Sequence, residues 1–203
     1  MPKRDAASRQ VLTDLRAATN ALHADLDQHV DGQRILEGKL EHDRYVQMLR
    51  AHYALHQLVA THTAAAASCG ALRLLDWPAC ERLPALQADL TQLGASASAM
   101  LQMKLPDVPL GGLAVAVGLI YVVEGACHGT GQMLRALSEN ADFQSWSATA
   151  FMQVSATSVS QRWPRTLELV QSVGTEDLDG VTRGAMGGYA YYRAAWDSAV
   201  PRR

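Results

Sequence analysis

The chain has 203 residues and a mass of 21.9 kDa, enough for one domain with a sizeable core. Its formal net charge of -2 and pI near 6.4 exclude the basic surface that binds nucleic acid or an anionic membrane. Three widely spaced cysteines fit neither a disulfide framework nor a zinc cluster. The charged N-terminus is not followed by an apolar signal core, so we expect a cytoplasmic protein.

Apolar residues at steps of three and four predict an N-terminal amphipathic helix over residues 7–28. His23 lies at the edge of its apolar stripe, and residues 1–6 are expected to be disordered. A second long helix is predicted over 41–67. Within it, His52 and His56 have the spacing of a metal-binding pair, but no third ligand lies nearby in sequence. The alternative is that both histidines pack against a neighbouring helix.

The rest of the chain is also helical in pattern. We expect short helices within 85–105, broken near Gly94, and further helices over 143–161, 164–173 and about 175–199. No stretch alternates apolar and polar residues as a strand does. The fold class is therefore all-α.

The apolar run over residues 113–137 carries four glycines, Gly118, Gly125, Gly129 and Gly131. Each glycine within a helix costs roughly 1 kcal/mol relative to alanine. A helix gains from glycine when a ligand or another backbone must come close to it. Gly125 and Gly129 share one face of an ideal helix. For this pair both explanations remain open: close approach of a ligand, or close packing against another helix. The run reaches Glu124 after about a dozen residues, short of the roughly 20 that span a membrane, and predicts a buried helix.

Two segments resemble the heme oxygenases. Leu15-Arg-Ala-Ala-Thr-Asn-Ala-Leu-His23 is similar to their opening helix. Tyr121-Val-Val-Glu-Gly125, with Gly129 four residues on, looks like the distal helix of bacterial members, including those paired with bacteriophytochromes. The resemblance implies a single helical domain over 1–203, with heme held between a proximal and a distal helix.

Carried over residue by residue, the resemblance makes His23 the proximal ligand to the iron of heme b. Arg16 would pair with a heme propionate, and Tyr121 would also contact the heme. Gly125 and Gly129 would bring distal backbone close to the iron and leave room for oxygen. Arg162 and Arg165 are candidates for a second propionate contact.

The implied activity is that of an O2- and electron-dependent oxidoreductase that cleaves heme to biliverdin, carbon monoxide and free iron. Because the chain has no flavin or dinucleotide fingerprint, electrons would come from an external donor such as a ferredoxin or a flavodoxin reductase system. A phytochrome would be a fitting acceptor for the product. No nucleic-acid or membrane partner is expected.

The sequence departs from the family around the glycines. Ala126 stands where animal enzymes keep an aspartate that orders water. His128 would either ligate the iron opposite His23, line the distal pocket as a polar group, or pack against a neighbouring helix. Cys127 should face away from the heme as a buried thiol. Thr130 should bond back to the preceding turn.

Two other functions stay open at this point. With His128 as a second axial ligand, the protein would be a heme-binding sensor or carrier without catalysis. The second resemblance is to the thiamin-degrading enzymes that share the helical architecture and use a nucleophilic cysteine. For that role the chain offers Cys69, which has no evident acidic partner in the sequence.

Overall fold

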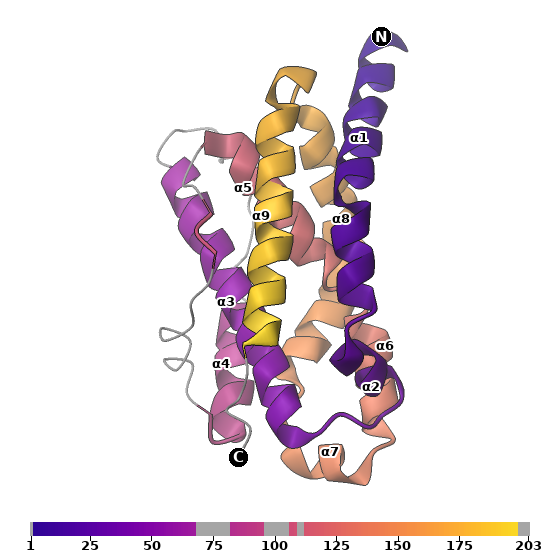
Figure 1. Cartoon of the computed structure of the whole chain (residues 1–203), viewed down its shortest axis with the longest axis vertical. Coiled ribbons are helices and arrows are strands. Elements are labelled where there is room, and N and C mark those ends of the chain that lie inside the picture. Colours follow the sequence, from indigo (N-terminus) through magenta and orange to yellow (C-terminus); the bar gives the residue numbers. More distant parts are fainter. Residues whose placement is uncertain (1, 68–81, 96–105, 109–111, 199–203) are drawn as a thin grey trace.

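The computed structural model describes residues 2–67, 82–95, 106–108 and 112–198. Figure 1 shows an all-helical bundle, and the described part of the chain contains no strand. The all-α prediction is confirmed. The elements in chain order are α1 (Pro2–Asp27), α2 (Val30–Leu36), α3 (His42–Ala67), α4 (Arg82–Gln92), α5 (Gly112–Gly125), α6 (Thr130–Ser138), α7 (Ala141–Trp146), α8 (Ala150–Ser172), the short 3-10 helix η3 (Thr175–Asp177) and α9 (Leu178–Asp197).

Some helix boundaries differ from those expected. Where the sequence predicted a disordered N-terminus for residues 1–6, α1 continues back to Pro2, because proline is compatible with a first helical turn and no breaker follows it. The helix predicted over 143–161 is broken after Trp146, where Ser147 has a positive φ, and its second part joins the helix predicted over 164–173 to form α8. Pro164 is exposed, so the carbonyl group that loses its partner there can bond to water. Cys69 lies outside the described residues.

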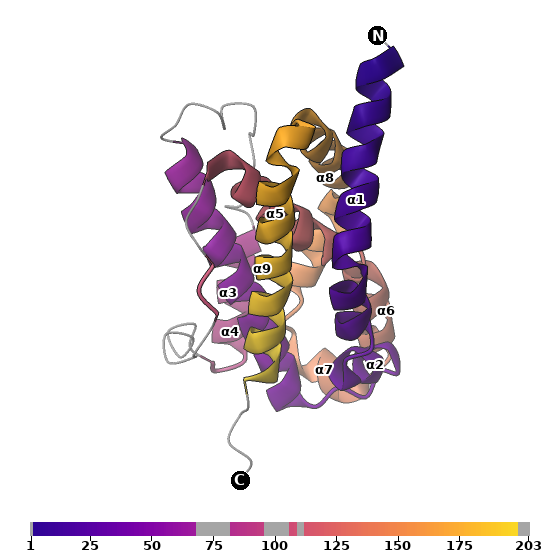
Figure 2. The same ribbon diagram turned by 45° about the horizontal axis from the view of Figure 1, so that its top comes forward.

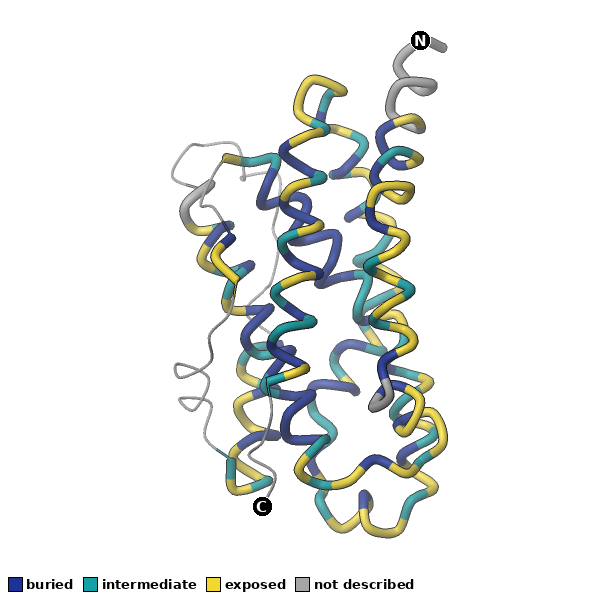
Figure 3. Tube along the Cα trace, in the orientation of Figure 1, coloured by how far each residue is buried: buried dark blue, intermediate teal, exposed yellow. Residues whose placement is uncertain are grey.

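Helix α5 is the centre of the bundle. Every residue from Val115 to Glu124 is buried, as expected for a helix that is apolar on all sides. It packs most extensively on α9 and also contacts α3 and α8. Figure 3 shows this buried core running behind α9, while α1 is buried along one stripe only.

Two glycines allow α5 and α9 to approach each other at backbone distance. A Cβ atom at Gly118 would overlap the carbonyl oxygen of Val181 and lie 2.6 Å from the amide nitrogen of Ala185. A Cβ atom at Gly184 would overlap the Val115 carbonyl oxygen in the same way. For Gly118, close helix packing is therefore the reason for glycine.

Helix α1 lies beside α9, and Figures 1 and 2 show both running in the same direction. Arg193 of α9 donates to a carboxylate oxygen of Asp25 at 2.5 Å. One turn further on, Nε2 of His29 lies 3.1 Å from a carboxylate oxygen of Asp197. These contacts fix the register of α1 on α9 just beyond His23.

The stretch Gly112–Ser138 is long and apolar enough to cross a membrane by length and composition alone. In this structure 61% of its most apolar window is buried inside the bundle. A turn at residues 126–129 also divides it into α5 and α6. These are the features of a core helix that bends.

Candidate functional site

A cavity of about 320 Å³ lies between α1 on one side and the α5–α6 region on the other. Helices α2, α3 and α9 supply the remaining walls. Its lining residues are His23, Leu26, Asp27, Gly32, Gln33, Leu36, His52, Val122, Ala126, Gly129, Gln132, Met133, Tyr189, Tyr192 and Trp196. The cavity is therefore mostly apolar, with a few polar groups converging on it, as is typical of a cofactor site.

His23 is the histidine that α1 contributes to this cavity. Its Nδ1 lies 2.9 Å from a carboxylate oxygen of Asp27, one helical turn later. The two side chains are 55% and 67% exposed, so they lie at the cavity mouth. A carboxylate on Nδ1 favours the tautomer with hydrogen there, which leaves the Nε2 lone pair free to bind a metal. The ring also makes an edge contact with Tyr189, at a centroid distance of 6.1 Å.

The opposite wall is formed where the predicted single helix over 113–137 is interrupted. From Cys127 to Thr130 the backbone hydrogen bonds change from the α-helical pattern to the tighter pattern of a 3-10 turn. The sulfur of Cys127 donates to the Val123 carbonyl oxygen, and the Thr130 hydroxyl donates to that of Cys127 at 2.7 Å. The predicted back-bond of Thr130 is confirmed. Side chains therefore compensate for hydrogen bonds altered by the turn.

The tighter turn changes which small residues face the cavity. Ala126 and Gly129 line it, together with Val122 and Met133. Gly125 does not share that face, because a Cβ atom there would stand 3.8 Å from the Trp163 ring on α8. The expectation that Gly125 and Gly129 lie on one face assumed an ideal helix, whereas the 3-10 turn rotates one residue relative to the other.

A buried ion cluster fixes the end of α5 just before this turn. Arg82 of α4 donates two hydrogen bonds to the Glu124 carboxylate, at 3.0 and 3.1 Å, and a third to Ser158. Arg162 of α8 donates to the same carboxylate from Nε at 3.1 Å. Glu124 has no exposed surface. A bidentate pair of this kind restricts geometry strongly, so α4, α5 and α8 are held together at the turn.

His52 and His56 do not form a metal site. Nε2 of His52 is 2.7 Å from the Tyr192 hydroxyl, and Nδ1 of His56 bonds to the His52 carbonyl oxygen. Both rings pack against Phe151. Within the described residues, no group of three or more His, Cys, Asp or Glu side chains is arranged to hold a metal ion. The packing alternative for these histidines is confirmed.

The other expected heme contacts do not line the cavity. Arg16 is exposed on α1, seven residues or about 10 Å of helix before His23. Tyr121 is buried, with its ring 5.4 Å from that of Trp163. Arg162 belongs to the ion cluster on Glu124, and Arg165 is exposed on α8.

His128 is exposed and is not among the lining residues. The edge of its ring meets Trp163 at a centroid distance of 4.8 Å. The structure therefore places His128 against α8, as in the packing alternative. Cys127 is fully buried, as expected, and burial raises the pKa of its thiol to about 11.

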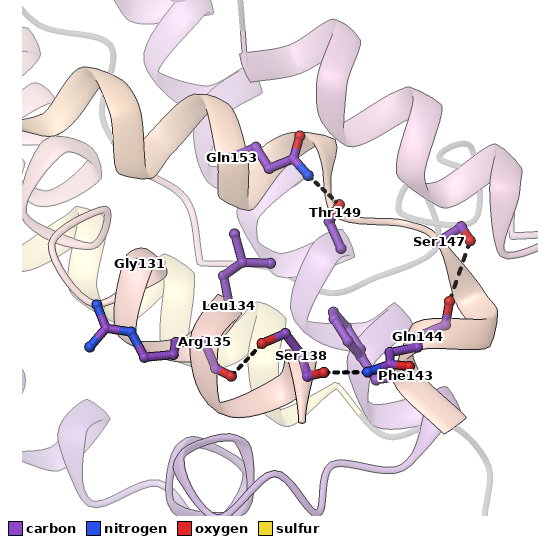
Figure 4. A pocket seen from close by; sticks show the side chains of 9 residues that line it. All are labelled: Gly131, Leu134, Arg135, Ser138, Phe143, Gln144, Ser147, Thr149 and Gln153. Carbon is purple, nitrogen blue, oxygen red and sulfur yellow. Dashed lines mark hydrogen bonds between the residues drawn. The ribbon is translucent and has the colours of Figure 1, made fainter. Parts of the chain in front are cut away.

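A second, larger hollow of about 620 Å³ lies over α6, α7 and the start of α8 (Figure 4). Its polar groups are largely bonded to one another: Gln153 donates to Thr149 at 2.8 Å, and Gln144 donates to the Ser138 carbonyl oxygen at 2.6 Å. The described residues that line it include no histidine, cysteine or carboxylate. The smaller cavity is therefore the better candidate site, because its lining includes two histidines and a carboxylate.

Residues 9–177 match the family model described as heme oxygenase. No curated protein matches the chain in a sequence comparison.

Proposed function

Because the chain belongs to the heme oxygenase family, we propose that it binds heme b in the cavity beside His23 and cleaves it to biliverdin, carbon monoxide and free iron. The observation that carries this proposal is the pairing across one cavity of a histidine whose Nδ1 lies against a carboxylate and a backbone with small side chains. His23 stands on α1, and Ala126 and Gly129 stand opposite.

The side chains present suit such a ligand. The His23–Asp27 pair is the arrangement in which a carboxylate orients a metal-binding imidazole. Apolar walls such as Leu26 and Met133 suit a porphyrin ring, and Arg16, two turns along α1, would pair with a propionate. When bound, heme supplies both the iron that reacts with dioxygen and the ring that is oxidised.

The chain itself contributes position and exclusion. His23 would hold the iron from one side, while Gly129 and Ala126 would leave space for dioxygen against the backbone on the other. Gly125 faces Trp163 behind the turn, where a methyl group would still fit, and would not act on the ligand directly. Electrons would come from an external ferredoxin or flavodoxin system in the cytoplasm, and a phytochrome would accept the product.

Titration of the purified protein with ferric heme tests the first half of the proposal. We expect saturation at one heme per chain with the spectrum of a histidine ligand. Reduction in air, with ascorbate or with ferredoxin and its reductase, should then yield bilin absorbance in the red and release carbon monoxide. Failure to bind heme would reject the proposal, whereas stable binding without bilin formation would leave a heme carrier.

A further inference from the structure

His52 and Tyr192 form a polar pair at the inner wall of the cavity. They come from α3 and α9, and the Tyr192 hydroxyl oxygen lies 2.7 Å from Nε2 of His52. Both side chains line the cavity, although their residues are only 2% and 4% exposed. Phe151 packs on the His52 ring at a centroid distance of 4.6 Å. The pair is therefore fixed in position and borders the space that a ligand would fill.

One hydrogen bond between these groups allows two proton arrangements. If Tyr192 donates, His52 carries its hydrogen on Nδ1, and a buried N–H remains without a partner among the described residues. If His52 donates from Nε2, its Nδ1 carries no hydrogen, and the Tyr192 O–H can donate to a different acceptor. The second arrangement leaves the phenol donor at the edge of the cavity, where a ligand or water can accept it.

Neighbouring histidines on α3 indicate which arrangement this core favours. His56 and His62 each use Nδ1 on the carbonyl group one turn earlier, which makes that nitrogen the donor. Within the described part of the chain, their buried Nε2 atoms are then lone pairs without a hydrogen-bond partner. Burial, and after it the positive charge of Arg82, lowers the pKa of both His52 and His56. The two neighbouring histidines thus leave a lone pair, and not an N–H, as the buried nitrogen that has no partner among the described residues.

We propose that His52 donates from Nε2 to Tyr192, so that Tyr192 presents its O–H to the cavity as a hydrogen-bond donor for a small ligand on the heme iron. The ligand class, dioxygen or another diatomic molecule, rests on the proposed function. Tyr192 is the binding group, and His52 positions it. Burial raises the pKa of Tyr192 and lowers that of His52 to about 3, so the pair stays neutral near pH 7. A donor facing the ligand is one of the features that decide how a heme pocket handles oxygen.

The proton arrangement is testable in the protein without heme. Long-range proton–nitrogen NMR correlations distinguish the two imidazole tautomers, and His52 is assigned by its loss in the variant His52→Gln. We expect hydrogen on Nε2 of His52. Hydrogen on Nδ1 would overturn the proposal, whether or not the protein binds heme, because Tyr192 would then be the donor within the pair.

The ligand side is tested with carbon monoxide as a probe of the ferrous heme complex. An O–H donor near the probe lowers the C–O stretching frequency, so Tyr192→Phe should raise it, and His52→Gln should broaden or shift it. Tyr191→Phe is the matched control, since Tyr191 is its neighbour on α9 and does not line the cavity. An unchanged frequency in Tyr192→Phe would refute the donor role even with normal heme binding. If the wild-type protein fails to bind heme, the proposed function falls, and the NMR result still decides the geometry.

Discussion

At the scale of single residues, Asp27 determines how His23 can act. A carboxylate 2.9 Å from Nδ1 orients the ring and leaves Nε2 available. The resemblance of the Leu15–His23 segment to the heme oxygenases pointed to His23, and Asp27 could have been found by its spacing of four residues. The His52–Tyr192 pair could not have been found in this way, because its members lie 140 residues apart and meet only when α3 packs on α9.

Replacing His23 with alanine should abolish the spectrum of histidine-ligated heme and the formation of bilin. Added imidazole should restore part of both, because it can occupy the space left by the side chain. The measurement is a heme titration followed by aerobic reduction. His42→Ala is a matched control, since His42 also pairs with a following aspartate, Asp43, but lies away from the cavity. If His23→Ala bound and degraded heme normally, the proximal assignment would be wrong.

Buried neutral histidines make the stability of this protein depend on pH. Burial lowers the pKa of His52 to about 3 and that of His56 well below its ordinary value of 6.5. In acid, the unfolded chain therefore takes up these protons before the folded chain does. This contribution to stability is complete above about pH 6.5 and is lost as pH falls toward 3, by about 1 kcal/mol per histidine per pH unit.

Urea unfolding at pH 7, 6 and 5 measures this dependence. The free energy of unfolding should decrease with acidity in the wild-type protein and decrease less steeply in His56→Leu, whatever that substitution does to stability at pH 7. Equal slopes in wild type and His56→Leu would contradict the assignment of a depressed pKa to His56.

At the scale of helices, the α5–α9 contact depends on glycines that carry no side chain, among them Gly118 and Gly184. A methyl group at Gly118 would meet backbone atoms of α9, which cannot rotate away. Gly118→Ala should therefore destabilise the fold by about 3 kcal/mol or more, at the upper end of overpacking effects. Gly131→Ala is the control, since its Cβ would lie 3.6 Å from Ala156 and should be tolerated. Urea unfolding of the two variants gives the comparison, and similar stabilities would show that α5 and α9 can separate at little cost.

The turn between α5 and α6 assigns different roles to its two glycines. Leucine at Gly129 would place a side chain at the cavity wall, so Gly129→Leu should weaken heme binding and suppress bilin formation. Gly125→Ala should bind heme normally, because its methyl group would be at ordinary contact distance from Trp163. Heme affinity and bilin yield, measured for each variant, test both expectations. Normal turnover in Gly129→Leu would mean that the turn does not face the iron.

Helix patterns were predicted well where the apolar period is regular, as in α1, α3 and α9. The break within the predicted helix over 113–137 was not predicted. The glycines indicate that another group can come close to the helix, but they do not indicate where the backbone hydrogen bonds change to the 3-10 pattern. The role of Glu124 was also missed. An isolated carboxylate in an apolar run signals a buried partner, but the partners Arg82 and Arg162 are brought to it only by α4 and α8.

At the scale of the whole molecule, the cavity lies between parts of the bundle that are otherwise joined indirectly. Helix α1 packs on α9 and α8, whereas the opposite wall belongs to α5 and α6. A ligand that touches both walls would couple them. The family and the two specific segments could be recognised from the sequence. The cavity could not, because it forms only when α1 is held in register on α9.

Heme should therefore stabilise the molecule, and it should protect α1 more than the rest. At a free heme concentration of about 100 times Kd, the gain is about 2.7 kcal/mol. Thermal unfolding and amide hydrogen exchange, with and without heme, measure the two effects. Iron-free protoporphyrin, which would fill the cavity without a bond to His23, should give less thermal stabilisation and less protection of α1. The variant His23→Ala with heme should show the same smaller effects. Protection centred on the second hollow, over α6 and α7, would instead move the binding site to the surface shown in Figure 4.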